Sequence, residues 1–398
     1  MGKASAKRVI LKGKDVITPE GVITDGFIEI ADGTITRVGS AGEYRAMAAW
    51  GQEDVEIMDE TGKIISPGFI DIHVHGGGGH EFSEGTLDAI EAAVRAHAQH
   101  GTTALLATPA SLPQDKLANC ARAVKEAMGR DLKGAQILGM HLEGPWLNPT
   151  KKGAQDPEAI RRPDIREFEE IWDASGNSVR HVTMAPEVVG GFEMIRVLKE
   201  RGITISAGHS AASYEQVLNA IKCGLTHTTH AFNGMVPLHH RDPGLVGAVL
   251  TRDELTTEMI VDGFHLHAAI VNLLYRCKGR ERLALVTDSI MAAGMPEGTY
   301  HLAGLKVKLS GDGSVRLADG TLAGSILTMD RAVSNTAKFL GVPIHDVIPM
   351  ASIVPARIIG VDNKKGSLEV GKDADIVVLD DDGTVHKTIV RGQVVYSA

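Results

Sequence analysis

Segments in which apolar and polar residues alternate lie near both ends of the chain, and such alternation predicts half-buried strands. The predicted strands span residues 8–11, 26–30, 34–38, 374–379, 385–390 and 393–396. Asp32-Gly33, between two of them, is a strong signal for a tight hairpin turn. Because the two ends of the chain share this pattern, we expect them to build one small β-sandwich domain jointly, from residues 1–65 and 355–398.

Between these segments, short apolar strands alternate with longer stretches whose apolar residues recur at helical spacing. Residues 87–100 and 214–222 are examples of the helical pattern. Strands that alternate with helices in this way indicate βαβ units and a parallel sheet. We therefore predict an α/β fold in which residues 66–354 form a TIM-type (β/α)8 barrel. The glycine-rich residues 301–323 predict a β insertion in the later part of that barrel.

The predicted strand of residues 69–74 leads to the first chemical signal. His73 and His75 are separated by one residue, so on an extended strand both side chains point to the same face. Glycines 76–79 follow at once, which places both imidazoles at the carboxyl end of the strand, where parallel barrels carry their active sites. Imidazole is the commonest metal ligand, and two on one strand form half a metal site. Taken alone, such a pair would more often be two solvated histidines.

The same feature recurs along the chain, and the repetition favours metal binding over the solvated alternative. Further apolar or β-branched strands end in a carboxylate or an imidazole, namely Glu143, His209, His227 with His230, and Asp288. Core packing explains one polar residue at such a position but not a series of them. Nitrogen and oxygen ligands without thiolate suit Zn, Fe, Mn or Co, so we predict a divalent transition metal without choosing among these four.

Several motifs occur in an order that is specific to one group of enzymes. They are PGFIDIHVH, HLEGPWLNP followed shortly by KKGA, GHS, THAFNGM, VTD and, near the end of the chain, GSLEVGKDADIV. In these motifs the chain resembles the amidohydrolase superfamily over nearly its whole length, and most closely those members that deacetylate phosphorylated N-acetyl amino sugars. The resemblance implies removal of the acetyl group from N-acetylglucosamine 6-phosphate, which gives glucosamine 6-phosphate and acetate.

The resemblance also implies a ligand set. Glu143, His209 and His230 would hold the primary ion. His73 and His75 would hold a second ion, with Glu143 as the bridge between the two. Some members of the superfamily have lost the second pair and work with one ion, whereas this chain keeps it, so one or two ions per chain are expected.

Two of these assignments have alternatives. His227 lies three residues before His230, so spacing alone does not separate them. The family pattern selects His230 and leaves His227 a structural or neighbouring role. Asp288 is expected to act as general base towards water and then as general acid towards the departing amine. The alternative is that Asp288 is only a metal ligand.

Recognition of the substrate is expected from loops beyond the ligands. Arg241 is the best candidate for the phosphate, because a guanidinium presents a planar fork to oxyanions. Asn233 and the backbone amide of Gly234 would add hydrogen bonds, and His265 matches a substrate-binding histidine of the family. Gln155 stands where many relatives carry a histidine that helps to polarise the acetyl carbonyl, and an amide there can donate a hydrogen bond but cannot become a cation. Three nearby histidines receive no role: His239, His240 and His267.

The composition of the chain argues against several classes of function. The chain has 398 residues, of which 43% are hydrophobic, enough for a large barrel and a small domain. A net charge of −9 argues against nucleic-acid binding, whose affinity depends on basic surfaces. The three cysteines are far apart in the sequence, so we expect reduced thiols and no disulfide. No apolar run could span a bilayer and none of signal-peptide type follows residues 1–7, so we expect a cytoplasmic protein that binds no membrane. We also expect a homodimer.

Two other functions compete with this one. The first is a related amidohydrolase that acts on N-acetylgalactosamine 6-phosphate or on another N-acylated small molecule. Such an enzyme would carry the same metal ligands. No residue in the sequence can be assigned to the hydroxyl group that distinguishes the two epimeric sugars. A barrel that serves only as a scaffold would usually have lost ligands, and this chain retains all of them.

Overall fold

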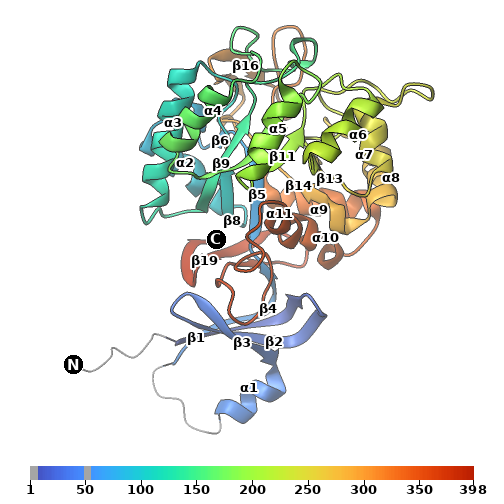
Figure 1. Ribbon diagram of the computed structural model, residues 1–398. Helices are drawn as coiled ribbons and strands as arrows, with labels where there is room; N and C mark the ends of the chain where they lie inside the picture. The colour runs from blue at the N-terminus through green and yellow to red at the C-terminus, as the bar shows by residue number, and fades with distance from the viewer. Residues whose placement is uncertain (1–7, 49–54) are drawn as a thin grey trace.

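The computed structural model describes residues 8–48 and 55–398, and its centre is a barrel of eight parallel strands in the hydrogen-bonded order β14-β13-β12-β11-β10-β9-β8-β5 (Figure 1). These strands are β5 (Phe69–Val74), β8 (Thr102–Ala107), β9 (Gln136–Glu143), β10 (Val179–Met184), β11 (Thr204–Ala207), β12 (His227–Thr228), β13 (Thr256–Met259) and β14 (Leu283–Leu285). Backbone hydrogen bonds beyond β14 close the ring onto β5, since His75 N donates to Ser289 O at 2.8 Å and Asp288 N donates to His73 O at 2.9 Å. The predicted barrel is confirmed.

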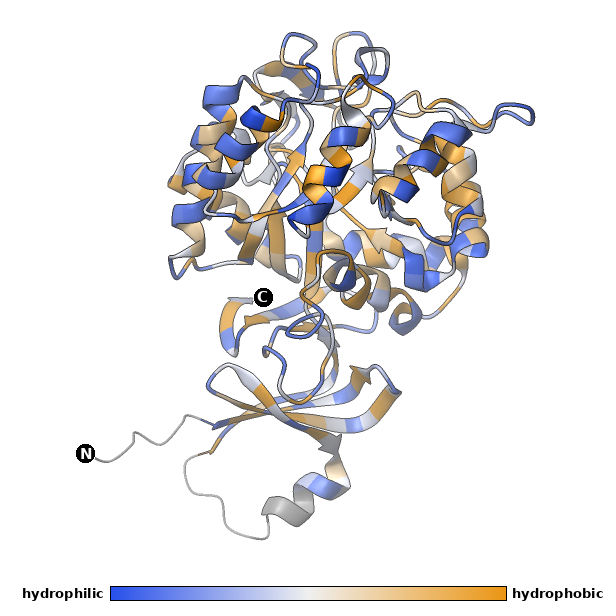
Figure 2. Ribbon diagram, in the orientation of Figure 1, coloured by the Kyte–Doolittle hydropathy of each residue, from blue (hydrophilic) through white to orange (hydrophobic). Residues whose placement is uncertain are grey.

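Each barrel strand is followed by helical structure that covers the outside of the sheet. The helices are α2 (Leu87–Ala98), α3 (Gln114–Met128), α4 (Ile165–Ala174), α5 (Gly191–Glu200), α6 (Tyr214–Cys223), α7 (Gly244–Thr251), α8 (Ala268–Lys278), α9 (Met329–Leu340), α10 (Ile344–Ala351) and α11 (Ile353–Ile358). Short 3-10 helices are η1 (Phe82–Glu84), η2 (Pro149–Lys151) and η3 (Arg280–Arg282). Figure 2 shows apolar residues along the strands and mixed colouring on the helices, as amphipathic helices require. Helices on the outside leave the strands buried on both faces, which is why β5 and β8 are buried throughout.

The glycine-rich stretch after β14 forms the predicted β insertion. It is a three-stranded antiparallel sheet of β15 (Gly298–Leu302), β16 (Leu305–Leu309) and β17 (Val315–Arg316). Its apolar residues, among them Leu302 and Val307, pack with Ile290 and Ala110 into a small separate core. A second small element, the hairpin of β6 (Gly76–Gly77) and β7 (His80–Glu81), follows β5 directly. Both lie at the carboxyl ends of the barrel strands, so they form walls around that end.

The two ends of the chain together form one seven-stranded sheet in the order β20-β19-β18-β4-β1-β2-β3. Its strands are β1 (Arg8–Thr18), β2 (Gly21–Ala31), β3 (Thr34–Ser40), β4 (Val55–Pro67), β18 (Ile376–Leu379), β19 (Val385–Val390) and β20 (Gln393–Ser397), and the helix α1 (Ala41–Ala48) follows β3. Asp32 and Gly33 both have positive φ, 50° and 75°, as the predicted hairpin turn requires.

This sheet curls so that its distant parts meet, and it thereby encloses a core of its own. Ile35 N donates to Lys372 O at 2.9 Å, and Ala374 N donates to Gly33 O at 2.8 Å. The enclosed core includes Ile35 on β3 and Ile389 on β19. The predicted domain from both termini therefore has a sandwich-like interior made by one continuous sheet.

The strand β4 ends at Pro67 and β5 begins at Phe69, with only Gly68 between them, so the terminal sheet runs directly into the barrel. The exact residue boundaries of the two predicted domains, 1–65 with 355–398 and 66–354, stay predictions. Residues 1–7 and 49–54 of the predicted terminal domain lie outside the described part of the chain. Among the described residues, no helix has the length and apolar character needed to cross a membrane.

A buried lysine joins the segment before β18 to the rest of the terminal sheet. Lys365 has 4% of its side chain exposed, and its Nζ lies 2.8 Å from Asp373 Oδ2 and 2.5 Å from Asp375 Oδ2. The other oxygen of Asp375 accepts a hydrogen bond from the backbone amide of Arg391 at 2.8 Å. Because the carbonyl of Asp375 also accepts from Gly68 N at 2.9 Å, this ion pair lies where the terminal sheet meets the barrel.

We predict that Lys365→Met lowers the free energy of unfolding by about 3–5 kcal/mol, because removal of one partner leaves a buried carboxylate uncompensated. Urea denaturation followed by circular dichroism measures the change. The matched control is Lys364→Met, since the neighbouring Lys364 is exposed. Equal stability of the two variants would show that the buried pair does not hold this junction together.

Candidate active site

The predicted site residues lie where the barrel strands end, and three of them sit on strained backbone. His209, His230 and Asp288 have positive φ values of 46°, 30° and 49°. Left-handed backbone costs residues other than glycine about 1–3 kcal/mol and persists only where the surroundings impose it. The strained turns direct these side chains towards the barrel axis, where His209, His230 and Asp288 are 6%, 4% and 8% exposed.

Glu143, at the end of β9, is the common neighbour of the site histidines. Its Oε1 lies 3.1 Å from His209 Nε2 and 3.2 Å from His230 Nε2, and these two nitrogens are 3.1 Å apart. Ligands of a tetrahedral ion at about 2.1 Å would lie roughly 3.4 Å from one another, so the three atoms are spaced close to what one cation requires. His227 is not part of this group, whereas His230, the predicted ligand, is.

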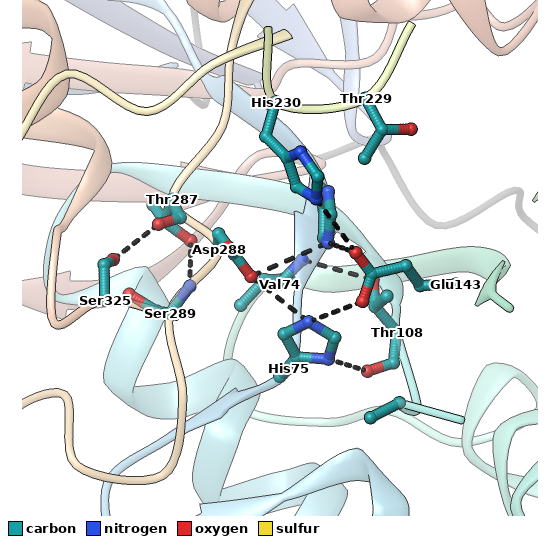
Figure 3. A network of polar contacts seen from close by, with 12 residues as sticks. Val74, His75, Thr108, Glu143, Thr229, His230, Thr287, Asp288, Ser289 and Ser325 are labelled. Carbon is teal, nitrogen blue, oxygen red and sulfur yellow. Dashed lines mark hydrogen bonds and ion pairs between the residues drawn. The ribbon is translucent and has the colours of Figure 1, made fainter. Parts of the chain in front are cut away.

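A second group of possible ligands lies against the first. It consists of His73, His75 and Asp288, and Figure 3 shows His75 between Glu143 and Asp288. His75 Nε2 is 3.2 Å from Glu143 Oε2 and 3.1 Å from Asp288 Oδ1. His73 Nε2 is 3.4 Å from Glu143 Oε1 and 3.6 Å from Asp288 Oδ1. Glu143 thus contacts both groups, as a carboxylate that bridges two ions would.

Hydrogen bonds on the far side of the rings decide which nitrogen faces the site. His75 Nδ1 donates to the carbonyl of Thr108 at 2.8 Å, and His209 Nδ1 donates to the carbonyl of Lys151 at 2.8 Å. His73 Nδ1 donates to Glu258 Oε2 at 2.9 Å. Since these acceptors take a proton from Nδ1, each ring presents Nε2 to the site, which is the arrangement typical of metal-binding histidines.

The electrostatics of the cluster also suit a cation. Burial raises the pKa of Glu143, but the charge of His73 and hydrogen bonds from His209 and His230 hold that pKa well below its usual value. Burial lowers the pKa of His75, whereas hydrogen bonds with Asp288 and Glu143 raise it to about 9. The two carboxylates therefore attract positive charge, which either imidazole protons or a divalent cation can supply. Metal binding at such sites releases protons.

The cluster forms the floor of a cavity of about 240 Å³. Of the predicted site residues, those that line it are His75, Glu143, Gln155, His209, His230, Asn233, Gly234, His265 and Asp288. Leu302, Thr321 and Leu322 of the insertion complete the wall. A larger cavity of about 720 Å³, between the terminal sheet and α3, is lined by none of the predicted site residues.

Two predicted residues do not line this cavity. His73 is completely buried and lies beneath the cavity. A residue there can still bind an ion that sits on the cavity floor. Arg241 is exposed in the loop between β12 and α7, where its Nη1 lies 2.8 Å from His240 Nε2. In Figure 1 a loop of this part of the chain projects from the barrel beside α7.

Two polar side chains in the wall are already held by neighbours. Gln155 is buried, its Nε2 donates to Glu143 Oε2, and its Oε1 accepts from Ser111 N at 2.7 Å. His265 Nδ1 lies 2.7 Å from Asp262 Oδ2, which leaves its Nε2 available. Among the histidines without a predicted role, His267 accepts from Ala269 N at 3.2 Å and caps α8.

The structure adds polar residues to the site that sequence reasoning missed. Glu258 on β13 contacts His73, while His141 and His181 stack in the barrel interior with ring centroids 4.0 Å apart. The sequence did contain one sign of this role: Glu258 is a charged residue inside a short strand that is otherwise apolar or β-branched, and buried charge of this kind indicates a specific partner. His227 also belongs to this interior layer, where its Nδ1 lies 2.6 Å from Thr256 Oγ1.

Comparison with known proteins agrees with this geometry. A sequence profile described as the amidohydrolase family matches residues 64–395. The chain is 38% identical to the N-acetylgalactosamine-6-phosphate deacetylase of Escherichia coli, over 96% of this chain and 98% of that protein. It is 36% identical to the N-acetylglucosamine-6-phosphate deacetylase of Bacillus subtilis, over 98% of each chain.

Solved structures give the same result. An Asp-to-Ala variant of the N-acetyl-D-glucosamine-6-phosphate deacetylase of Mycobacterium smegmatis, in complex with N-acetyl-D-glucosamine 6-phosphate, superposes with a TM-score of 0.90. Its sequence is 34% identical, and the match covers 98% of this chain and 100% of that one. With its barrel, its strand-end histidines and carboxylates, and this similarity over nearly its full length, the chain belongs to the amidohydrolase family.

Proposed function

We propose that this protein is a metal-dependent deacetylase that hydrolyses the amide bond of N-acetylglucosamine 6-phosphate, giving glucosamine 6-phosphate and acetate. The observation that carries the proposal is the meeting of Glu143, His209 and His230 with Asp288 on the floor of one cavity. Relatives named as N-acetylglucosamine-6-phosphate deacetylases that match nearly the whole chain support the substrate.

In this proposal, Glu143, His209 and His230 hold the primary divalent ion, and His73 and His75 hold a second one. The donor set of nitrogen and oxygen atoms suits Zn, Fe, Mn or Co. A bound ion supplies Lewis acidity, which polarises an amide carbonyl and makes water more acidic. Glu143 is held for this role by Gln155, whose amide donates to the carboxylate oxygen on the side of His75.

Asp288 is the proposed proton carrier. Burial raises the pKa of Asp288, but the positive charge of His73 and a hydrogen bond from His75 lower it. An ion held by His73 and His75 would supply positive charge in the same place, so the carboxylate is ionised and can accept a proton. It takes a proton from the attacking water and then delivers it to the nitrogen of the departing amine. Asp288 lines the cavity, so an amide bound there would lie beside its carboxylate.

The remaining wall residues orient the sugar. His265, held by Asp262, offers Nε2 to a hydroxyl or phosphate oxygen, and Asn233 and Gly234 line the same side of the cavity. Gln155 also lines the cavity and is the proposed neighbour of the acetyl group, and its amide nitrogen donates to Glu143. Of the described residues that line the cavity, none is a lysine or an arginine.

A lysine or arginine that binds the phosphate must therefore come from outside the cavity lining, and Arg241 remains the proposed donor. Its loop must fold over the cavity, or a neighbouring copy of the chain must supply it. The expected homodimer and cytoplasmic location likewise stay predictions.

The second candidate substrate is N-acetylgalactosamine 6-phosphate, because one relative of 38% identity is named for that activity. Acetate release from the two phosphorylated epimers, measured side by side with the unphosphorylated sugars, tests the choice. A kcat/KM that is highest for N-acetylglucosamine 6-phosphate supports the proposal. A preference for the galactose epimer, or no acetate from either, overturns it.

For the metal centre, we predict that His209→Asn abolishes activity and most metal binding, because it removes one of three ligands of the primary ion. Replacing His73 and His75 together by glutamine should remove at most the second ion and lower the rate. Metal content per chain and acetate release measure both effects. His345→Asn, at an exposed histidine of α10, is the control and should match the wild type. If the double variant retained two equivalents of metal, the assignment of that pair would be wrong.

For the proton carrier, we predict that Asp288→Asn lowers kcat about 10²-fold or more, the size expected for losing general acid–base help. KM should change little, because the amide keeps the shape of the side chain. Metal content is measured in parallel, since loss of an ion would identify Asp288 as a ligand instead. Asp253→Asn, at an exposed aspartate, serves as the control. Turnover near the wild-type value would remove Asp288 from the mechanism.

For the phosphate, we predict that Arg241→Ala lowers kcat/KM for the phosphorylated sugar roughly ten- to a hundred-fold, because a charge-assisted hydrogen bond contributes about 1.5–3 kcal/mol. Hydrolysis of unphosphorylated N-acetylglucosamine should stay unchanged, since it offers Arg241 nothing to bind. Arg276→Ala, at an exposed arginine of α8, is the control. An equal loss on both substrates would mean that Arg241 supports the fold rather than the phosphate.

A further inference from the structure

A buried carboxylate beneath the candidate site has no place in the proposed reaction. Glu258, on the barrel strand β13, has no exposed surface, and no atom of it lines the cavity. Burial of a carboxylate is costly unless hydrogen bonds and positive charge compensate for it. The partners of Glu258 therefore indicate what the residue does.

One oxygen of Glu258 joins the two halves of the candidate metal centre. Oε2 accepts from His73 Nδ1 at 2.9 Å and from the backbone amide of His230 at 3.0 Å. His73 belongs to the group with His75 and Asp288, and His230 belongs to the group with Glu143 and His209. A single atom thus contacts one residue from each group, across sequence separations of 185 and 28 residues.

The contact with His73 has a chemical consequence, because an ionised carboxylate only accepts hydrogen bonds. When the His73 ring is neutral, as it must be to bind an ion, its one proton resides on Nδ1, and the lone pair of Nε2 faces Glu143 and Asp288. His73 Nε2 is buried and has no hydrogen-bond partner among the described residues, so it is free to bind an ion. His75 is oriented in the same manner, but by the neutral carbonyl of Thr108.

We propose that Glu258 is a positioning residue of the metal centre: it fixes the ring and tautomer of His73 and so sets the affinity of the second subsite, which His73 and His75 form. This inference rests on the metal centre of the proposed function but on no particular substrate. Carboxylates that orient a ligating histidine typically change metal affinity about 10–100-fold when removed.

A different role for Glu258 would use its other oxygen. Oε1 lies 3.4 Å from His227 Nε2, and together with His181 these residues form a third buried group of possible ligands. In that case Glu258 would itself bind an ion. The two roles predict different numbers of ions per chain, so metal content separates them.

The test uses the full-length protein with Zn²⁺ or Co²⁺ as the probe, added to metal-free wild type, Glu258→Gln and His227→Gln. Glutamine keeps the shape of Glu258 but presents an amide that no longer demands a proton from His73. We expect the second equivalent of metal to bind about 10–100-fold more weakly to Glu258→Gln, while the first equivalent is retained. His227→Gln, which leaves both contacts of Oε2 in place, should stay within twofold of the wild type.

A double-mutant cycle distinguishes positioning through His73 from a general loss of structure. If Glu258 acts through His73, then Glu258→Gln should cause no further loss of second-site affinity once His73 is replaced by glutamine. Additive losses would overturn the inference. Should Glu258→Gln fail to fold, Glu258→Asp, which withdraws the carboxylate by one methylene, replaces it, and unchanged second-site affinity in that variant would overturn the inference equally.

The number of ions that the wild-type chain binds also tests the inference separately from the proposed function. Binding of only one ion, or of a third ion that is lost in His227→Gln, contradicts the inference and leaves the proposed deacetylation untouched. Two ions without acetate release from any of the sugars would contradict the proposed function and leave the role of Glu258 intact.

Discussion

The site depends on one buried carboxylate that gathers side chains from separate barrel strands. Glu143 lies within 3.4 Å of four imidazole nitrogens, from His73, His75, His209 and His230. A carboxylate in the barrel interior requires positive charge near it, and a cation shared by these ligands would satisfy that requirement. The positive φ values, the Nδ1 hydrogen bonds and the glycines near His209 all keep the rings directed at this one group. Gly234, for example, lies so near that an added Cβ would be 3.1 Å from His209 Nδ1.

Much of this arrangement was predictable, because parallel strands place their carboxyl ends together whatever the details of the fold. Strand-end residues such as Glu143 and Asp288 could therefore be expected to meet, and in the structure they line one cavity. The hairpin at Asp32-Gly33 was equally predictable, since its conformation depends on local backbone preferences. The extent of β12 was not, because the strand keeps only His227–Thr228 before the backbone turns to bring His230 inward.

What the sequence did not reveal depends on contacts between distant residues. Periodicity indicates which face of a strand is buried, but not which side chain from another strand will meet it there. From the sequence alone, Glu258 is only a polar residue in a short strand, and its role becomes apparent from its contact with His73 in the structure. Arg241 is predicted to belong to the site because it follows His230 closely in the sequence, but its loop places it at the protein surface. The curl of the terminal sheet is likewise a long-range property, since it brings Gly33 against Ala374.

The order of strands in the terminal sheet also constrains how the chain folds during its synthesis. The strand β4, which leads directly into the first barrel strand, pairs with β1 on one side and with β18 on the other. As the ribosome releases the chain, Ile64 and Ile65 thus have an unpaired edge until residues 376–379 have been made. An apolar strand with a free edge is a site for association with other chains. A strand made about 310 residues after β4 therefore covers the edge that leads into the barrel, and termination before residue 376 would leave that edge exposed.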